Sequence, residues 1–168
     1  MRCLLAERPR DSWADPSLPE MARFWLHMHD GFRGQTARMA DLVRQGQTDA
    51  RAVHVPLIQT LSAFLQHLDG HHRIESGRYF PMFRRAEPRV AEGLDLLDRD
   101  HDAIHAHIEA MHRSGLAYHQ AVGSAAPAID ELARFGETLA RAEPSLVRHL
   151  DDEEEIVIPL IAVHGVRE

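Results

Sequence analysis

The chain has 168 residues, the usual length of one domain with a sizeable core, so we do not expect a second domain. Its formal charge of −7 argues against nucleic acid or an anionic membrane surface as a partner, because both select for clustered Lys and Arg. No apolar run approaches the ~18 residues needed to cross a bilayer. Cys3 is the only cysteine and the N-terminus lacks a secretory signal, so we expect no intrachain disulfide and a cytoplasmic location.

The composition predicts an all-α protein. Hydrophobic residues make up 44% of the chain and aromatic residues only 6%. Ala, Leu, Arg and Glu are abundant and β-branched runs are few, a balance that favours helix over sheet. Thirteen histidines exceed what packing needs in a helical protein, so the composition also indicates metal or proton chemistry.

The N-terminal part of the sequence predicts an arm followed by a helix. Residues 1–18 show no sustained hydrophobic period, and we interpret them as an arm that lies on the rest of the protein or is loose, with Trp13 as a candidate anchor. The first helix is expected over residues 19–45. Pro19 suits a first helical turn, and Gly46 suits the position after the last one.

The second helix begins at Asp49 or at Pro56 and is expected to continue to about residue 85. Pro81 cannot donate a hydrogen bond to the carbonyl of Gly77, four residues back, so we predict a kink there. The third helix starts near residue 88 and ends near residue 115 or residue 123.

The fourth helix is predicted over residues 127–165. Pro144 lies inside it, so this helix is expected either to kink or to consist of two segments that share an axis. Four helices with mostly short connections predict an up-down-up-down antiparallel four-helix bundle over residues 19–165.

Two matched motifs mark the functional site. His71 precedes Glu75 by four residues, His149 precedes Glu153 by four, and each histidine is followed ten residues later by a proline. A spacing of four places imidazole and carboxylate on one face of a helix, roughly 6 Å apart along the axis. Each motif is therefore predicted to supply half of a metal site.

A second repeat precedes each of these motifs. His29-Asp30 stands before the first and His101-Asp102 before the second, with His105 one helical turn after His101. The repeated motifs therefore predict two helix pairs with inward histidines on all four helices.

This arrangement resembles the hemerythrin family, also called the HHE cation-binding domain, over about residues 19–162. The resemblance implies two non-heme iron ions at the centre of the bundle, bridged by an oxo or hydroxo group. The same donors also suit manganese or zinc. The family's ligands match seven residues of this sequence: His29, His71, Glu75, His101, His105, His149 and Glu153.

Comparing the two halves of the sequence predicts an unequal pair of metals. When His29 is aligned with His101, Arg33 stands where the other half has His105. One metal then receives two histidines, His29 and His71, and the other receives three: His101, His105 and His149. We predict that the small ligand binds the metal with two histidines, because that metal is left one ligand short.

Some of these ligands have competitors in the sequence. His27 and His29 point some 200° away from each other on a helix, and the repeat at His101-Asp102 favours His29. The spacing of four favours His71 over His72.

The carboxylate of the last helix stays open between Glu153 and Glu154, because some family members place it five residues after the histidine. The acidic run 151–155 is otherwise expected to be a solvated face, with Glu153 its one inward member. The remaining histidines are treated as non-ligands, although His67 lies one turn before His71: His54, His67, His107, His112, His119 and His164.

Tyr79 and Arg33 are candidate pocket residues beside the metals. Tyr79 follows Glu75 by one turn, where a phenol could donate a hydrogen bond or an electron or bind metal. A partly buried structural tyrosine is an equally good interpretation. Glu109-x-x-His112 fits a ferritin-like motif, but such bundles need a second copy, which the sequence lacks.

The resemblance implies a protein that binds dioxygen, nitric oxide or hydrogen peroxide at an open iron position, for binding or sensing. The alternative is a di-iron enzyme with catalase-like or nitric oxide reductase activity, which a donor such as Tyr79 or Arg33 would help. Five histidines and two carboxylates stabilise ferric ions less than a carboxylate-rich set would, which favours reversible binding.

Overall fold

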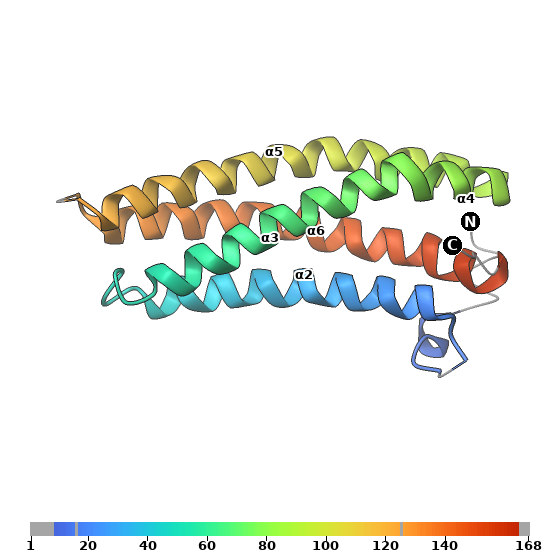
Figure 1. Ribbon diagram of the computed structural model, residues 1–168, viewed down its shortest axis with the longest axis horizontal. Coiled ribbons are helices and arrows are strands. Elements are labelled where there is room, and N and C mark those ends of the chain that lie inside the picture. The colour runs from blue at the N-terminus through green and yellow to red at the C-terminus, as the bar shows by residue number, and fades with distance from the viewer. Residues whose placement is uncertain (1–8, 16, 125, 165–168) are drawn as a thin grey trace.

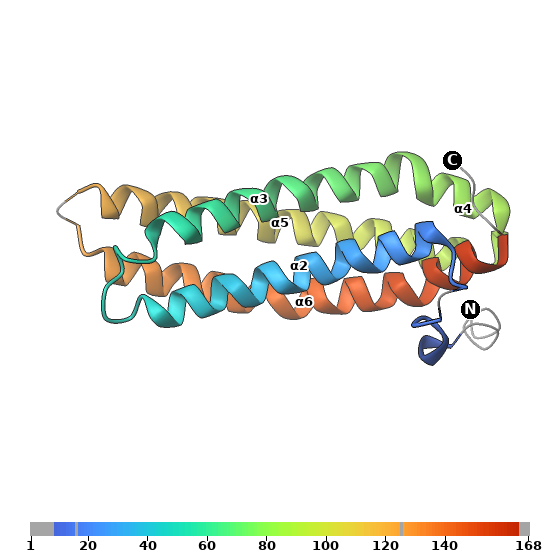
Figure 2. The same ribbon diagram turned by 60° about the horizontal axis from the view of Figure 1, so that its bottom comes forward.

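The computed structural model describes residues 9–15, 17–124 and 126–164, and within these residues the chain is helical, without strands (Figure 1). Successive long segments run in opposite directions and pack side by side, as the turned view also shows (Figure 2). The predicted all-α four-helix bundle is thereby confirmed. The elements are η1 (Arg10–Ser12), α2 (Glu20–Gln45), α3 (His54–Ile74), the π-helical η2 (Glu75–Tyr79), α4 (Phe80–Ala86), η3 (Pro88–Val90), α5 (Ala91–Val122) and α6 (Ala128–His164).

The observed helix ends follow from local sequence. Pro19 is the N-cap of α2, and the N–H of Gly46 donates to the carbonyl of Leu42 at 2.9 Å where that helix stops. Before α3, Asp49 Oδ1 accepts from the backbone N–H groups of Arg51 and Ala52, which forms the turn that precedes the helix.

Gly115, one of the two predicted ends of the third helix, lies inside α5. Its role is in helix packing. A Cβ atom at this position would overlap Leu61 on α3, so the missing side chain lets the two helices approach. Helix α6 is one continuous element that contains both Pro144 and Pro159, so Pro144 does not divide it. Its expected end at residue 165 lies outside the described residues.

A π-helical turn stands where the kink was predicted. The N–H of Phe80 donates to the carbonyl of Glu75, five residues back, immediately before Pro81. Such turns insert one residue into the helical repeat and recur at functional sites. The turn therefore changes the direction of the side chains that follow Glu75, compared with a regular α-helix.

Buried apolar side chains form two clusters. One includes Phe32, Phe64 and Leu146, and the other includes Trp25 and Phe83. Between them lies a layer of buried histidines and glutamates, all less than a tenth exposed except His71, which is partly buried. Polar groups held between apolar clusters destabilise the fold unless they find partners, so this layer requires a functional explanation.

The described part of the N-terminal segment lies on α6. Arg10 donates to the backbone carbonyl of Asp151 at 3.0 Å and forms ion pairs with Glu154 at 3.7 Å and Glu155 at 3.5 Å. Trp13 packs against the apolar cluster that contains Trp25. Of the two conformations expected for the arm, residues 9–15 and 17–18 therefore adopt the one in contact with the bundle. None of the described helices has the length and apolar character needed to cross a membrane.

Candidate metal centre

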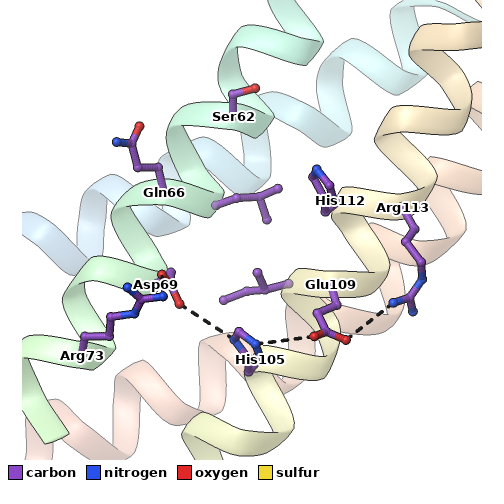
Figure 3. A pocket seen from close by; sticks show the side chains of 10 residues that line it. Ser62, Gln66, Asp69, Arg73, His105, Glu109, His112 and Arg113 are labelled. Atoms are coloured by element: carbon purple, nitrogen blue, oxygen red, sulfur yellow. Dashed lines mark ion pairs between the residues drawn. The ribbon is translucent and has the colours of Figure 1, made fainter.

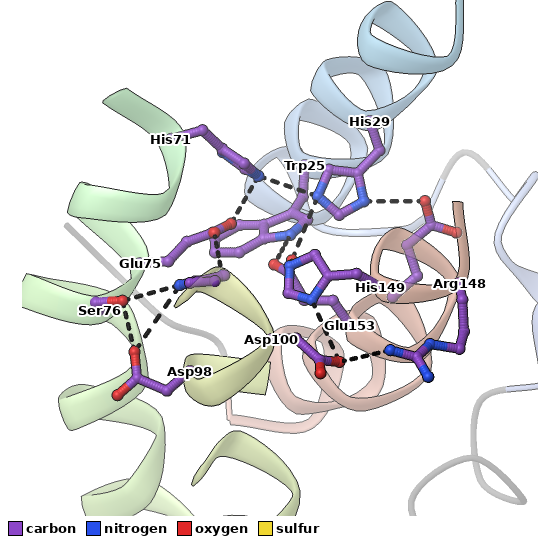
Figure 4. Close-up of polar contacts among 12 residues, drawn as sticks. Trp25, His29, His71, Glu75, Ser76, Asp98, Asp100, Arg148, His149 and Glu153 are labelled. Atoms are coloured by element: carbon purple, nitrogen blue, oxygen red, sulfur yellow. Dashed lines mark hydrogen bonds and ion pairs between the residues drawn. The ribbon is translucent and has the colours of Figure 1, made fainter. Parts of the chain in front are cut away.

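The buried histidines and glutamates form two groups in the bundle. Figure 4 shows how His29, His71 and the two glutamates converge, with His149 beside them. Within each group, every residue offers one ligand atom within 4.8 Å of the ligand atoms of the others. The first group draws on α2, α3, η2 and α6, and the second on α3, α5 and α6. The first group consists of His29, His71, Glu75 and Glu153, and the second of His72, His101 and His149.

The first group is compact. Nε2 of His29 lies 3.1 Å from Nε2 of His71, which is in turn 2.7 Å from Oε1 of Glu75. Oε2 of Glu153 lies 3.7 Å from Nε2 of His29. Two imidazole nitrogens and two carboxylates therefore face one point.

The second group is a cluster of three imidazoles. The rings of His72 and His101 stack with their centroids 4.1 Å apart, and His149 meets them edge-on at 5.4 Å and 4.9 Å. All three Nε2 atoms are buried and lack a hydrogen-bond partner among the described residues.

The two glutamates connect the groups. Oε2 of Glu75 lies 3.5 Å from Nε2 of His101, although Oε1 of the same carboxylate faces His71. Oε2 of Glu153 lies 3.4 Å from Nε2 of His149. Each carboxylate is thus positioned between the two groups.

The unpaired atoms of this layer indicate cation binding. Buried polar atoms in folded proteins almost always have hydrogen-bond partners, so a convergent set without partners is exceptional. Imidazole and carboxylate together are the donors that iron, manganese and zinc accept. The unpaired ligand atoms are Nε2 of His72, His101 and His149, both side-chain oxygens of Glu75, and Oε2 of Glu153.

Burial keeps three histidines of the layer, His71, His72 and His101, in the neutral form that binds metal. Burial lowers the pKa of His71 and of His101 to about 4 each, and that of His72 to about 2. Each imidazole is therefore neutral near pH 7, which is the form that coordinates a metal.

The pKa values of the two glutamates are shifted in opposite directions. Burial raises the pKa of Glu75, and the neighbouring Glu153 raises it further. For Glu153, burial acts in the same upward direction, but the neighbouring imidazoles of His149 and His29 lower the pKa overall. A cation between them would stabilise the ionised form of both carboxylates.

Six of the seven predicted ligands lie in this layer, whereas His105 does not. The side chain of His105 is 56% exposed in a surface groove between α3 and α5, with Nδ1 3.9 Å from Asp69 and Nε2 3.6 Å from Glu109 (Figure 3). The inward face of α5 continues from His101 through Ile104 instead, three residues on. His105, one residue further along, is turned toward the groove.

His72 joins the layer in place of His105. Adjacent residues on a helix point about 100° apart, and the inner face of a bundle helix is at least that wide. His71 therefore meets His29 on α2, while His72 meets His101 on α5. The spacing argument set His71 and His72 against each other, but both are inward. The adjacent pair of histidines is the sequence signal that could have identified this position.

Glu154 stands behind His29 instead of joining either group. Its Oε1 accepts hydrogen bonds from Nδ1 of His29 at 3.0 Å and from Nη1 of Arg33 at 2.7 Å. Because Nδ1 of His29 is the donor, its Nε2 presents a lone pair to the centre. Glu154 is buried, so the acidic run has two inward members and not the single one expected.

Arg33 is placed by these same carboxylates. Besides Glu154, it donates to Asp151 Oδ1 at 2.8 Å. Burial alone would lower its pKa, but the hydrogen bond to Glu154 contributes to a net increase. Arg33 is thus connected to His29 through Glu154, and its guanidinium donates hydrogen bonds to two carboxylates.

The ring of His101 also has a partner on the side that faces away from the centre. Ser76 Oγ lies 3.0 Å from Nδ1 of His101 and donates to Asp98 at 2.5 Å. Partners of this kind fix ring orientation in metal sites.

Tyr79 belongs to neither group. Its half-buried ring packs edge-on against Trp25, with centroids 5.1 Å apart, and stacks on Phe83. The π-helical turn separates it from the face that carries Glu75. The histidines expected to be non-ligands also lie outside both groups: His54, His67, His107, His112, His119 and His164.

Comparison with known proteins bears on this geometry. Residues 20–161 match the family model of the hemerythrin HHE cation binding domain. The match runs from the start of α2 into the last turn of α6 and contains every residue of both groups. Searches of curated proteins and of solved structures found no match. The chain therefore belongs to the hemerythrin HHE cation-binding domain family.

Proposed function

We propose that this protein holds two iron ions in its bundle and uses them to bind a small ligand such as dioxygen, nitric oxide or hydrogen peroxide. The observation that supports this most strongly is the set of buried, unpaired imidazole and carboxylate atoms between the apolar clusters. The match of residues 20–161 to a cation-binding domain also supports metal binding by this part of the chain, which contains all of these atoms.

The proposed ligand set is shared unequally. His29 and His71 serve one ion, and both carboxylates lie within reach of the second ion as well. Three histidines serve that second ion: His72, His101 and His149. As predicted from the sequence, the proposal gives two histidines to one ion and three to the other, but His72 takes the place of His105. A solvent-derived bridge would complete the set, and the ion with two histidines is where we propose that the small ligand binds.

Reversible binding is favoured over turnover. Two ions ~3.5 to 4 Å apart can share the electrons given to a bound ligand. Turnover also needs a proton or electron donor at that ligand. The ring of Tyr79 packs against Trp25, and the guanidinium of Arg33 is engaged by Glu154 and Asp151, which argues against direct donation by either. Peroxide disproportionation or nitric oxide reduction is the alternative.

A cytoplasmic location, expected from the single cysteine, is part of the same proposal.

Metal analysis of anaerobically purified protein tests the proposal. We expect two irons per chain, with an absorption spectrum that changes in air and returns when oxygen is removed. Loss of peroxide or nitric oxide faster than with free iron would favour the enzyme. Protein that retains no transition metal after loading would contradict the proposed centre itself.

A further inference from the structure

Trp25 makes the two glutamates of the centre unequal. Its indole Nε1 donates a hydrogen bond of 2.7 Å to Oε1 of Glu153, between α2 and α6 (Figure 4). Both side chains are buried, with Trp25 4% exposed and Glu153 fully enclosed. Only Oε2 of Glu153 is left unpaired, and this oxygen faces both His29 and His149.

Glu75 has no such partner among the residues that the structure describes. Both of its oxygens are unpaired, with Oε1 near His71 in the first group and Oε2 near His101 in the second. Glu75 can therefore give one oxygen to each ion, whereas Glu153 has one free oxygen, which it can give to one of the two ions.

Two physical effects keep Oε1 of Glu153 with the indole. A short hydrogen bond to a carboxylate is charge-assisted and strong, and it makes the accepting oxygen less basic than its neighbour. If Oε1 turned away to bind metal, the buried indole N–H would lose this acceptor in apolar surroundings, which is unfavourable.

Packing prevents the indole from following the carboxylate. The ring of Trp25 contacts Tyr79 at 5.1 Å, His71 at 5.9 Å and Phe83 at 6.1 Å between centroids. Rings packed this closely on several sides do not rotate without displacing their neighbours.

We propose that Trp25 is a positioning residue that restricts Glu153 to one metal-binding oxygen, while Glu75 bridges with two. This inference rests on the proposed function, because it concerns how the same centre binds its ligand. A single-oxygen Glu153 fills one coordination position fewer than a two-oxygen bridge. That position is then available to a small anionic or diatomic ligand.

The test compares three variants of the iron-loaded, full-length chain. Trp25→Phe removes the N–H and keeps an aromatic ring. Replacing Trp25 by 3-benzothienylalanine puts sulfur in place of the N–H and preserves the shape of indole, which covers the case in which the smaller Phe does not pack. Trp13→Phe is the matched control, because it removes the other tryptophan.

Two measurements are made on each protein. Infrared difference spectra between loaded and metal-free protein report whether carboxylates bind through one or two oxygens, from the separation of their two stretching bands. Azide titration of the ferric protein reports the available position. In both Trp25 variants we expect a one-oxygen carboxylate signal to disappear and azide affinity to fall about tenfold or more. The control should match the wild type.

Different outcomes would contradict the role of Trp25 and the proposed function. If the wild type loads two irons and binds azide, and both Trp25 variants give the same infrared bands and azide affinity, then the role of Trp25 is wrong and the centre stands. If the wild type fails to hold two ions, then the proposed function fails and this inference with it.

Discussion

Arg33 and Glu154 form an ion pair behind His29, with Nη1 of Arg33 2.7 Å from the carboxylate oxygen that also accepts the hydrogen bond from His29. Glu154 is almost completely enclosed, whereas Arg33 is partly exposed. The ion pair lies between solvent and Nδ1 of His29, and Nε2 of the same ring faces the centre. A histidine held in this way has a fixed tautomer and increased basicity toward a metal.

Replacing Glu154 with alanine should therefore weaken metal binding without removing a ligand. We expect iron affinity to fall by about 10- to 100-fold in Glu154→Ala, the usual effect of losing a partner behind a metal-binding histidine. Competition with a chelator measures it. Glu154→Gln retains an acceptor for His29 and should lose less. Glu155→Ala is the control, since Glu155 is exposed and forms an ion pair with Arg10 at the surface. Equal affinities in all three variants would show that Glu154 does not act on His29.

His72 and His105 provide a direct test of which histidine serves the second ion. His72→Ala removes an enclosed imidazole of that group, so the iron content should fall from two per chain to about one. His105→Ala removes an exposed side chain and should leave two. Iron analysis after identical loading measures both. The opposite pattern would restore His105 as the ligand.

The stability of the metal-free protein should depend on pH through its buried histidines. His71, His72 and His101 have pKa values below 6.5 in the folded protein, chiefly because of burial. The unfolded chain therefore binds more protons than the folded one below pH 6.5. The free energy of unfolding should fall as the pH decreases from 6.5 toward about 4, by up to ~1.4 kcal/mol per pH unit for each histidine.

Glu75 acts in the opposite direction within this range. Its raised pKa means that the folded state holds a proton that the unfolded state releases above pH 4.5, which lowers stability as the pH rises. Three histidines against one carboxyl leave the net slope positive. Urea unfolding at several pH values measures it, with exposed His112 replaced by Asn as the control. A stability that does not change between pH 6.5 and 4.5 would contradict the assignment.

The contact between α3 and α5 should tolerate an added methyl group poorly at Gly115. A Cβ atom there would overlap Leu61, whereas one at Gly34 would meet nothing within 4 Å. Gly34→Ala should raise the free energy of unfolding by about 0.5–1 kcal/mol, because alanine favours helix. In Gly115→Ala, overpacking of about 1–3 kcal/mol should cancel this gain. Chemical unfolding of both variants measures the difference. Equal stabilisation would mean that Leu61 moves aside freely.

Local patterns in the sequence were enough to predict most of the fold. Proline and glycine positions located the start and end of α2, and the composition predicted that the rest of the chain is helical as well. The matched His-x-x-x-Glu motifs also placed His71, Glu75, His149 and Glu153 in one layer. These signals depend on the helical repeat within one segment, so they do not need the tertiary structure.

Tertiary structure alone decided which side chains beyond the motifs face the centre. Whether His72, His105 or Glu154 points inward depends on how each helix is rotated against two neighbours, and the spacing within one helix does not contain that rotation. The hydrogen bond from Trp25 to Glu153 joins residues 128 positions apart in the chain, so only the packed bundle brings them together. The sequence by itself thus determined the helices, the family and the kind of donor. The packing of the helices determined which donors meet, because it sets the rotation of each helix about its own axis.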